Sequence, residues 1–89
     1  MDKQKLHEQL ERLHADLQQI KAPDTDDREV LSSLAQDIKR ILEHEGSDRE
    51  EYQGLIDRLS DAITKFEAAH PRTTLLMRQV LDQIAYLGI

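Results

Sequence analysis

The chain has 89 residues, of which 38% are hydrophobic and 34% are charged, and its formal net charge is −6. This length allows one small domain over residues 1–89, and the absence of cysteine excludes disulfides, thiolate metal sites and a cysteine nucleophile. The acidic balance argues against nucleic acid and membrane surfaces as partners, because both carry negative charge.

No apolar run approaches the roughly 18 residues that a membrane-spanning helix needs. The N-terminal residues from Met1 to Lys5 lead into an amphipathic segment and not into the apolar block of a signal peptide. We therefore expect a soluble, cytoplasmic protein. Large apolar residues recur with helical spacing along almost the whole chain, and the prolines and glycines lie mostly between these runs. The composition predicts a helical bundle.

The first predicted helix extends from about Asp2 to Lys21, and Pro23 ends it because proline lacks an N–H and disfavours helical dihedrals at the residue before it. Its large apolar residues follow one another at alternate steps of four and three, which is the heptad pattern of a coiled-coil seam. A seam this narrow can face one partner. It is the first candidate interface and consists of Leu6, Leu10, Leu13, Leu17 and Ile20.

The second predicted helix begins after Thr25 or Asp26. Asp26 and Glu29 have the spacing of a capping pair, and the acidic first turn suits the helix dipole. The apolar residues of this helix cover a wider stripe, which can contact two neighbours. Gly46 is predicted to end the helix as a left-handed C-cap.

A capping box predicts the start of the third helix, with Ser47 at the N-cap and Glu50 at the third helical position. Apolar residues from Tyr52 to Phe66 then follow near heptad spacing. Gly54 falls on the opposite, solvated side of this helix, and we assign it no function.

The fourth predicted helix begins at His70-Pro71, because proline suits the first helical position, and Gly88 ends it. It is the least polar segment of the chain, so we expect Leu76–Leu87 to form the centre of the core. A second candidate interface points away from the main apolar stripe of this helix and consists of Leu75, Tyr86 and Ile89.

Short connections between the four segments favour antiparallel neighbours. We predict an all-α, antiparallel up-down four-helix bundle with coiled-coil-like heptad packing. One alternative keeps the third and fourth helices continuous, with a kink at Pro71.

Two Glu-x-x-His pairs, Glu11 with His14 and Glu67 with His70, have the spacing found in carboxylate-bridged di-iron bundles. The heptad register turns the two glutamates away from the core, and no further buried glutamate completes such a site. We interpret all four as surface residues.

One flank of the first helix carries His7, Glu11 and His14 at positions i, i+4 and i+7, which would suit a divalent ion. A metal-binding or catalytic bundle that uses these three residues is therefore the alternative function. The chain has no serine nucleophile elbow and no glycine-rich phosphate loop. We predict a protein that is not an enzyme and has no catalytic residue, metal or cofactor.

Several segments resemble a family of small bacterial proteins known only as a domain of unknown function, and the resemblance covers nearly the whole chain. The matching segments are Lys5-Leu6-His7-Glu8-Gln9-Leu10 with Leu13-His14, Phe66-Glu67 before His70-Pro71, and Asp82 and Ala85 before Leu87-Gly88-Ile89. The resemblance implies a bacterial, all-helical protein with no assigned activity, substrate or cofactor. From the residues themselves we expect a protein that acts by binding proteins, through self-association as a homo-oligomer or as an adaptor.

Overall fold

The computed structural model describes residues 3–21, 24–44 and 49–88. These residues form four helices, and no strand occurs within the three described ranges. The helices are α1 (Lys3–Gln19), α2 (Thr25–Glu43), α3 (Arg49–Phe66) and α4 (Pro71–Leu87). The predicted all-α fold and the number of its helices are confirmed.

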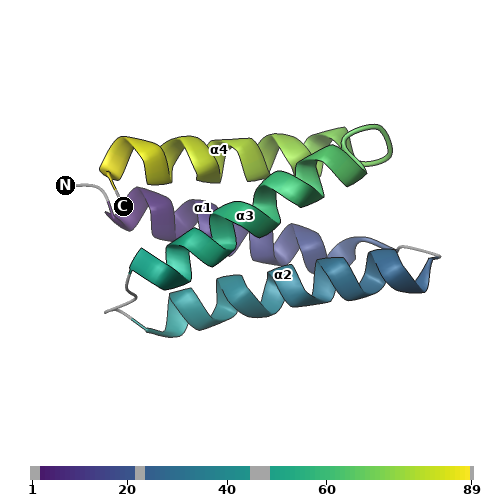
Figure 1. Ribbon diagram of the computed structural model, residues 1–89, viewed down its shortest axis with the longest axis horizontal. Coiled ribbons are helices and arrows are strands. Elements are labelled where there is room, and N and C mark those ends of the chain that lie inside the picture. The colour runs from purple at the N-terminus through teal and green to yellow at the C-terminus, as the bar shows by residue number, and fades with distance from the viewer. Residues whose placement is uncertain (1–2, 22–23, 45–48, 89) are drawn as a thin grey trace.

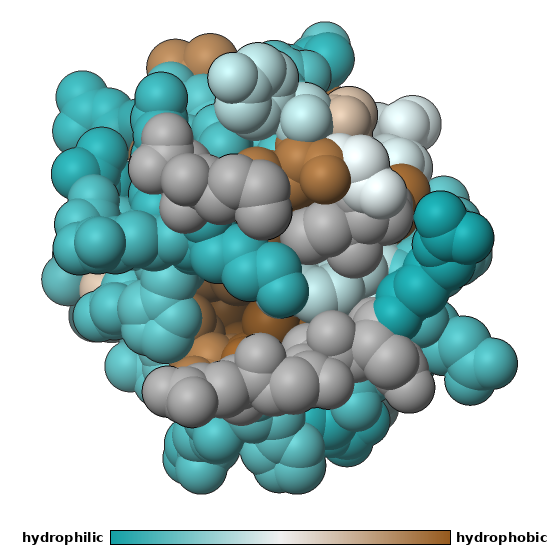
Figure 2. Space-filling view, turned by 90° about the vertical axis from the view of Figure 1, so that its left-hand side faces the viewer, coloured by the Kyte–Doolittle hydropathy of each residue, from teal (hydrophilic) through white to brown (hydrophobic). Residues whose placement is uncertain are grey.

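The four helices are arranged as a closed up-down bundle. Consecutive helices pack side by side in opposite directions, and α1 also packs against α4 (Figure 1). The described part of the chain measures 39 × 20 × 19 Å along its principal axes. Figure 2 views the end at which α1 begins and α4 ends, where hydrophilic residues surround a few visible hydrophobic ones. The coiled-coil-like character of the packing stays a prediction.

A single apolar core fills the space between the four helices. Leucines of α1 and α3 lie at its centre: Leu13 and Leu59 have 0% of their surface exposed, and Leu55 has 1%. Ile38 of α2 and Met77 of α4 are also fully buried, at 0% each. The apolar positions predicted from helical spacing in the first three helices therefore face this core.

The start of α2 differs from the prediction. The helix is capped by Asp24, whose Oδ1 accepts a hydrogen bond from the backbone N–H of Asp26 at 3.1 Å. The predicted pairing of Asp26 with Glu29 is wrong, because the helix already includes Thr25 and places Asp26 inside its first turn. An aspartate cap still satisfies a free N–H at the helix start, as the acidic turn suggested.

The end of α2 lies at Glu43, where the backbone N–H of His44 donates to the carbonyl oxygens of Arg40 and Ile41 at 3.2 and 3.3 Å. The predicted C-cap Gly46 and the predicted N-cap Ser47 both lie outside the described residues.

Helices α3 and α4 are separate, so the alternative of one continuous, kinked helix is wrong. After Phe66 the chain turns over residues 67–69, and α4 begins at Pro71 as predicted. A continuous helix would lose a backbone hydrogen bond at Pro71 and would bring its ring against the preceding turn. Gly88 ends α4 in the left-handed conformation, with φ of 73°, which also agrees with the prediction.

The prediction that Leu76–Leu87 forms the centre of the core holds for only one face of α4, on which Met77, Val80 and Ile84 are 0–1% exposed. The buried residues of α4 are three apolar and three polar ones: Met77, Val80, Ile84, Thr73, Thr74 and Gln83. Leu76, Leu81 and Leu87 are only partly buried. Because α4 contacts α1 and α3 alone, its neighbours cover a limited arc, and the apolar residues of α4 spread beyond that arc.

Candidate interaction surfaces

The first candidate interface is occupied within the chain itself. Leu6, Leu10, Leu13 and Leu17 have 0–5% of their surface exposed, and Ile20 is partly buried against the same core. These side chains contact the other helices of the bundle. The predicted availability of this seam to a second chain is therefore corrected: folding of the chain already covers it.

The second candidate interface is exposed on the outer face of α4. Leu75 has 54% and Tyr86 has 81% of its surface exposed, and they are the large hydrophobic residues exposed in the described part of the chain. They are 11 residues apart and differ by about 20° around the helix. The third predicted member, Ile89, lies outside the described residues.

The exposed face of α4 also carries polar side chains between its two apolar ones. Gln79 and Asp82 lie at steps of four and seven residues from Leu75, and both are exposed. We call the face formed by Leu75, Gln79, Asp82 and Tyr86 the α4 stripe. It has an apolar residue at each end and hydrogen-bonding groups in the middle.

A groove of about 620 Å³ lies between α1 and α4, and three residues of the α4 stripe line it: Gln79, Asp82 and Tyr86. Lys5 and Gln9 of α1 face Asp82, Gln83 and Tyr86 of α4 across it. The Oε1 atom of Gln9 is buried and accepts no hydrogen bond from a described residue. The surface next to the stripe is therefore polar.

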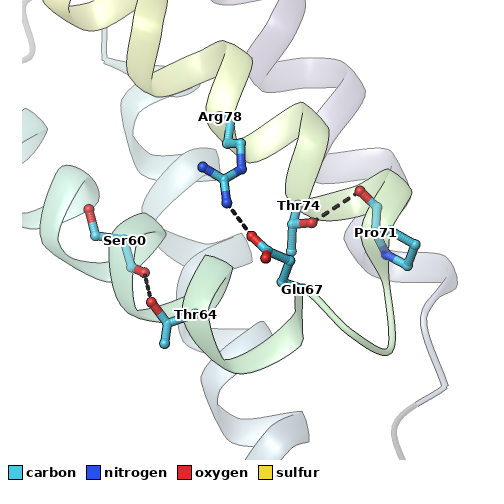
Figure 3. A network of polar contacts seen from close by, with 6 residues as sticks. All are labelled: Ser60, Thr64, Glu67, Pro71, Thr74 and Arg78. Carbon is cyan, nitrogen blue, oxygen red and sulfur yellow. Dashed lines mark hydrogen bonds and ion pairs between the residues drawn. The ribbon is translucent and has the colours of Figure 1, made fainter.

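The residues of the two Glu-x-x-His pairs are not brought together. Glu67 forms an ion pair with Arg78 of α4 (Figure 3). The ring of His70 lies 6.1 Å from the ring of Phe66. In the same region the Oγ1 of Thr74 donates to the carbonyl oxygen of Pro71 at 3.0 Å. These contacts join residues on either side of the turn between α3 and α4.

The three residues proposed as a metal site on the flank of α1 do not come together at one point. His7 Nε2 lies 3.0 Å from Glu11 Oε1, and both side chains are more than half exposed, at 51% and 61%. His14 instead lines a groove between α1 and α2. Within residues 3–21, 24–44 and 49–88, no group of three or more His, Asp or Glu residues could hold a metal ion.

Sequence reasoning missed that groove between α1 and α2, whose volume is about 370 Å³. Its cationic side chains are Arg28 and Lys39 of α2, opposite His14 of α1. No motif marks these residues, because they come from two helices. The signal available was the polar stripe of α2, in which Arg28, Ser32 and Lys39 lie near one helical phase.

Among the described residues, Tyr52 is the titratable group with a perturbed pKa. Burial raises the pKa of the Tyr52 phenol above its ordinary value, and the neighbouring carboxylate of Glu51 raises it further. Tyr52 belongs to the core, with 8% of its surface exposed. The perturbation therefore reports packing, and Tyr52 faces neither of the two surfaces described above.

Among the described residues, none of the helices combines the length and the apolar character that a bilayer-spanning helix requires. A family model described as a domain of unknown function (DUF4404) matches residues 6–89. The match includes all four helices except the first residues of α1. No curated protein and no solved structure matches the chain.

Proposed function

The chain belongs to the DUF4404 family of domains of unknown function, and we propose that it acts by binding a second copy of itself through the α4 stripe. The observation that carries the proposal is the exposure of Leu75 and Tyr86, at 54% and 81%, on one face of one helix. Leu75 and Tyr86 lie three turns apart on the same face of α4, so one partner helix can contact both of them.

The charge of the α4 stripe favours an antiparallel pair. In a parallel pair related by a two-fold axis, the two Asp82 carboxylates would lie opposite each other and repel. An antiparallel pair places Leu75 of one protomer opposite Tyr86 of its partner. Asp82 then faces Gln79 of the partner, whose amide can donate a hydrogen bond to the carboxylate. Each contact occurs twice by symmetry.

A contact limited to one helix face buries less surface than a standard protein interface of about 1,600 Å². We therefore expect weak association, with a Kd on the order of 10–100 µM. The same face could also bind the helix of another protein, which would make the chain an adaptor. The proposal describes a non-enzymatic protein of the bacterial cytoplasm.

Sedimentation equilibrium at protein concentrations from about 5 to 500 µM tests the proposal, since this range brackets the expected Kd. The wild-type chain should change from monomer to dimer. The double variant Leu75→Glu/Tyr86→Glu should remain a monomer, because it places four carboxylates in the contact.

A matched control is Gln53→Glu/Ser60→Glu, which adds the same charge at exposed positions of α3. This variant should associate as the wild type does, and circular dichroism should show that both variants keep their helices. A wild-type chain that stays monomeric over the whole range, or a dimer that persists in Leu75→Glu/Tyr86→Glu, contradicts the proposal.

A further inference from the structure

The groove between α1 and α2 combines an apolar floor with cationic walls. Leu17, Leu31 and Ala35 line it together with the cationic side chains of α2 and with His14. No aspartate or glutamate among the described residues lines this groove.

Three carboxylates of α1 and α2 form contacts with helices other than the one across the groove. On α2, Asp27 Oδ1 lies 3.2 Å from Lys65 Nζ of α3. Asp37 of α2 forms an ion pair with Arg58, which is also on α3. On α1, Asp16 accepts a hydrogen bond from Thr73 of α4. The ion pairs of α2 among the described residues thus connect it to α3, and none of them involves Arg28 or Lys39.

The two cations of the groove are not neutralised by the bundle. Arg28 and Lys39 are exposed, and neither side chain forms an ion pair or hydrogen bond with a described residue. They are 11 residues apart, which is three turns and about 16 Å along α2. Their spacing matches carboxylates three turns apart on another helix.

We infer that this groove binds an acidic amphipathic helix of a partner protein. The groove is open along two helices, so it suits a third helix laid over it, as helices bind in the grooves of other proteins. Two glutamates of the incoming helix would meet Arg28 and Lys39, and apolar side chains between them would cover Ile20 and Ala35, which the bundle leaves only partly buried. No α4 residue lines the groove, so this site goes beyond the proposed self-association.

The probe for the test is a fluorescein-labelled helical peptide of about 16 residues, long enough to span both cations. It carries two glutamates three turns apart, with leucines on the same face between them. A second peptide has glutamine in place of both glutamates. Fluorescence anisotropy should show that the glutamate peptide binds the full chain and that the glutamine peptide binds about fivefold to tenfold more weakly.

The variant Arg28→Gln/Lys39→Gln should weaken binding of the glutamate peptide by the same factor. Its matched control is Arg12→Gln/Arg72→Gln, which removes two positive charges at exposed positions outside the groove and should change the affinity less than about twofold. No binding of the glutamate peptide up to about 1 mM, equal binding of both peptides, or an equal loss in the two variants overturns the proposal.

Two measurements separate this site from the α4 stripe. In amide NMR spectra, the glutamate peptide should shift the resonances of Leu17, Ser32 and Gln36, and shifts centred on α4 would contradict the inference. In sedimentation equilibrium without peptide, Arg28→Gln/Lys39→Gln should show the oligomeric state of the wild type. If this variant abolishes self-association, the groove is a contact between copies, and the inference of a separate partner helix is wrong.

Discussion

Helices α1 and α4 lie side by side but use their apolar residues in opposite ways. Every large apolar residue of α1 is buried, although the helix is otherwise polar. Helix α4 is the least polar of the four, yet it exposes Leu75 and Tyr86 and buries Thr73, Thr74 and Gln83. The comparison shows that position around the helix, and not the number of apolar residues, decides what reaches the core.

The difference follows from how narrow the apolar stripe of each helix is. Alternate steps of four and three residues keep the leucines of α1 within about 80° of one another, and two neighbouring helices cover that arc completely. In α4 the apolar residues are distributed around a wider arc. Those at its margins are left partly or fully exposed, and polar residues in the covered arc must form hydrogen bonds.

The largest expected effect comes from a leucine of α1. Leu13→Ala should lower the free energy of unfolding by about 2–5 kcal/mol, because it leaves a cavity at a fully buried position. Leu75→Ala on α4 should change the free energy of unfolding by less than about 0.5 kcal/mol. Urea denaturation followed by circular dichroism measures both, and equal losses would show that the two helices do not differ as described.

An intermediate effect should come from the polar contact between these helices. Thr73→Val removes the hydroxyl that donates to Asp16 while keeping a branched side chain, and should lower the free energy of unfolding by about 1–2 kcal/mol. The control is Thr64→Val, at an exposed position where Oγ1 donates to the Ser60 carbonyl oxygen at 3.2 Å; it should have a smaller effect. A stabilised Thr73→Val variant would mean that apolar burial outweighs the hydrogen bond.

The smallest expected effect compares a buried with an exposed tyrosine. Because the fold raises the pKa of Tyr52, the folded state keeps its phenol neutral at pH values where the unfolded chain, with a pKa of about 10, begins to ionise. This contribution to stability is complete below that pKa and is lost as the pH rises above it. The Tm of Tyr52→Phe should therefore fall less than that of the wild type between about pH 9 and 11, by a few degrees at most.

Tyr86→Phe is the matched control, since Tyr86 is 81% exposed on α4. Its Tm should follow the wild type through the same pH range. A Tm of Tyr52→Phe that also follows the wild type would show that the Tyr52 phenol does not contribute to the alkaline loss of stability.

Much of the fold could be predicted because helix signals are local. Heptad spacing placed the leucines of α1 in the core, and Pro71 and Gly88 marked the ends of α4. The depth of α4 could not be predicted, since it depends on which arc α1 and α3 cover. The cap at Asp24 was missed because several acidic residues in that turn could serve as caps, and only the backbone geometry selects one.

The candidate surfaces were predictable to a lesser degree. The exposure of Leu75 and Tyr86 follows from their phase, which differs from that of the main apolar stripe of α4. The groove with Arg28 and Lys39 could not be found from the sequence, because His14 and the apolar floor come partly from another helix. The α1 leucines were interpreted as a possible contact with a second chain, but they are buried in the bundle. A heptad pattern shows that a helix has a packing face and does not show whether that face packs within the same chain or on another one.

The amino acids by themselves therefore determine where the helices form and which face of each helix is apolar, because backbone hydrogen bonds and helical periodicity depend on residues a few positions apart. Packing decides the rest: that the leucines of α1 are buried, that α4 keeps an exposed stripe, and that two cations of α2 line the groove next to α1. These outcomes depend on neighbours that are distant in the sequence and meet only when four helices share one core.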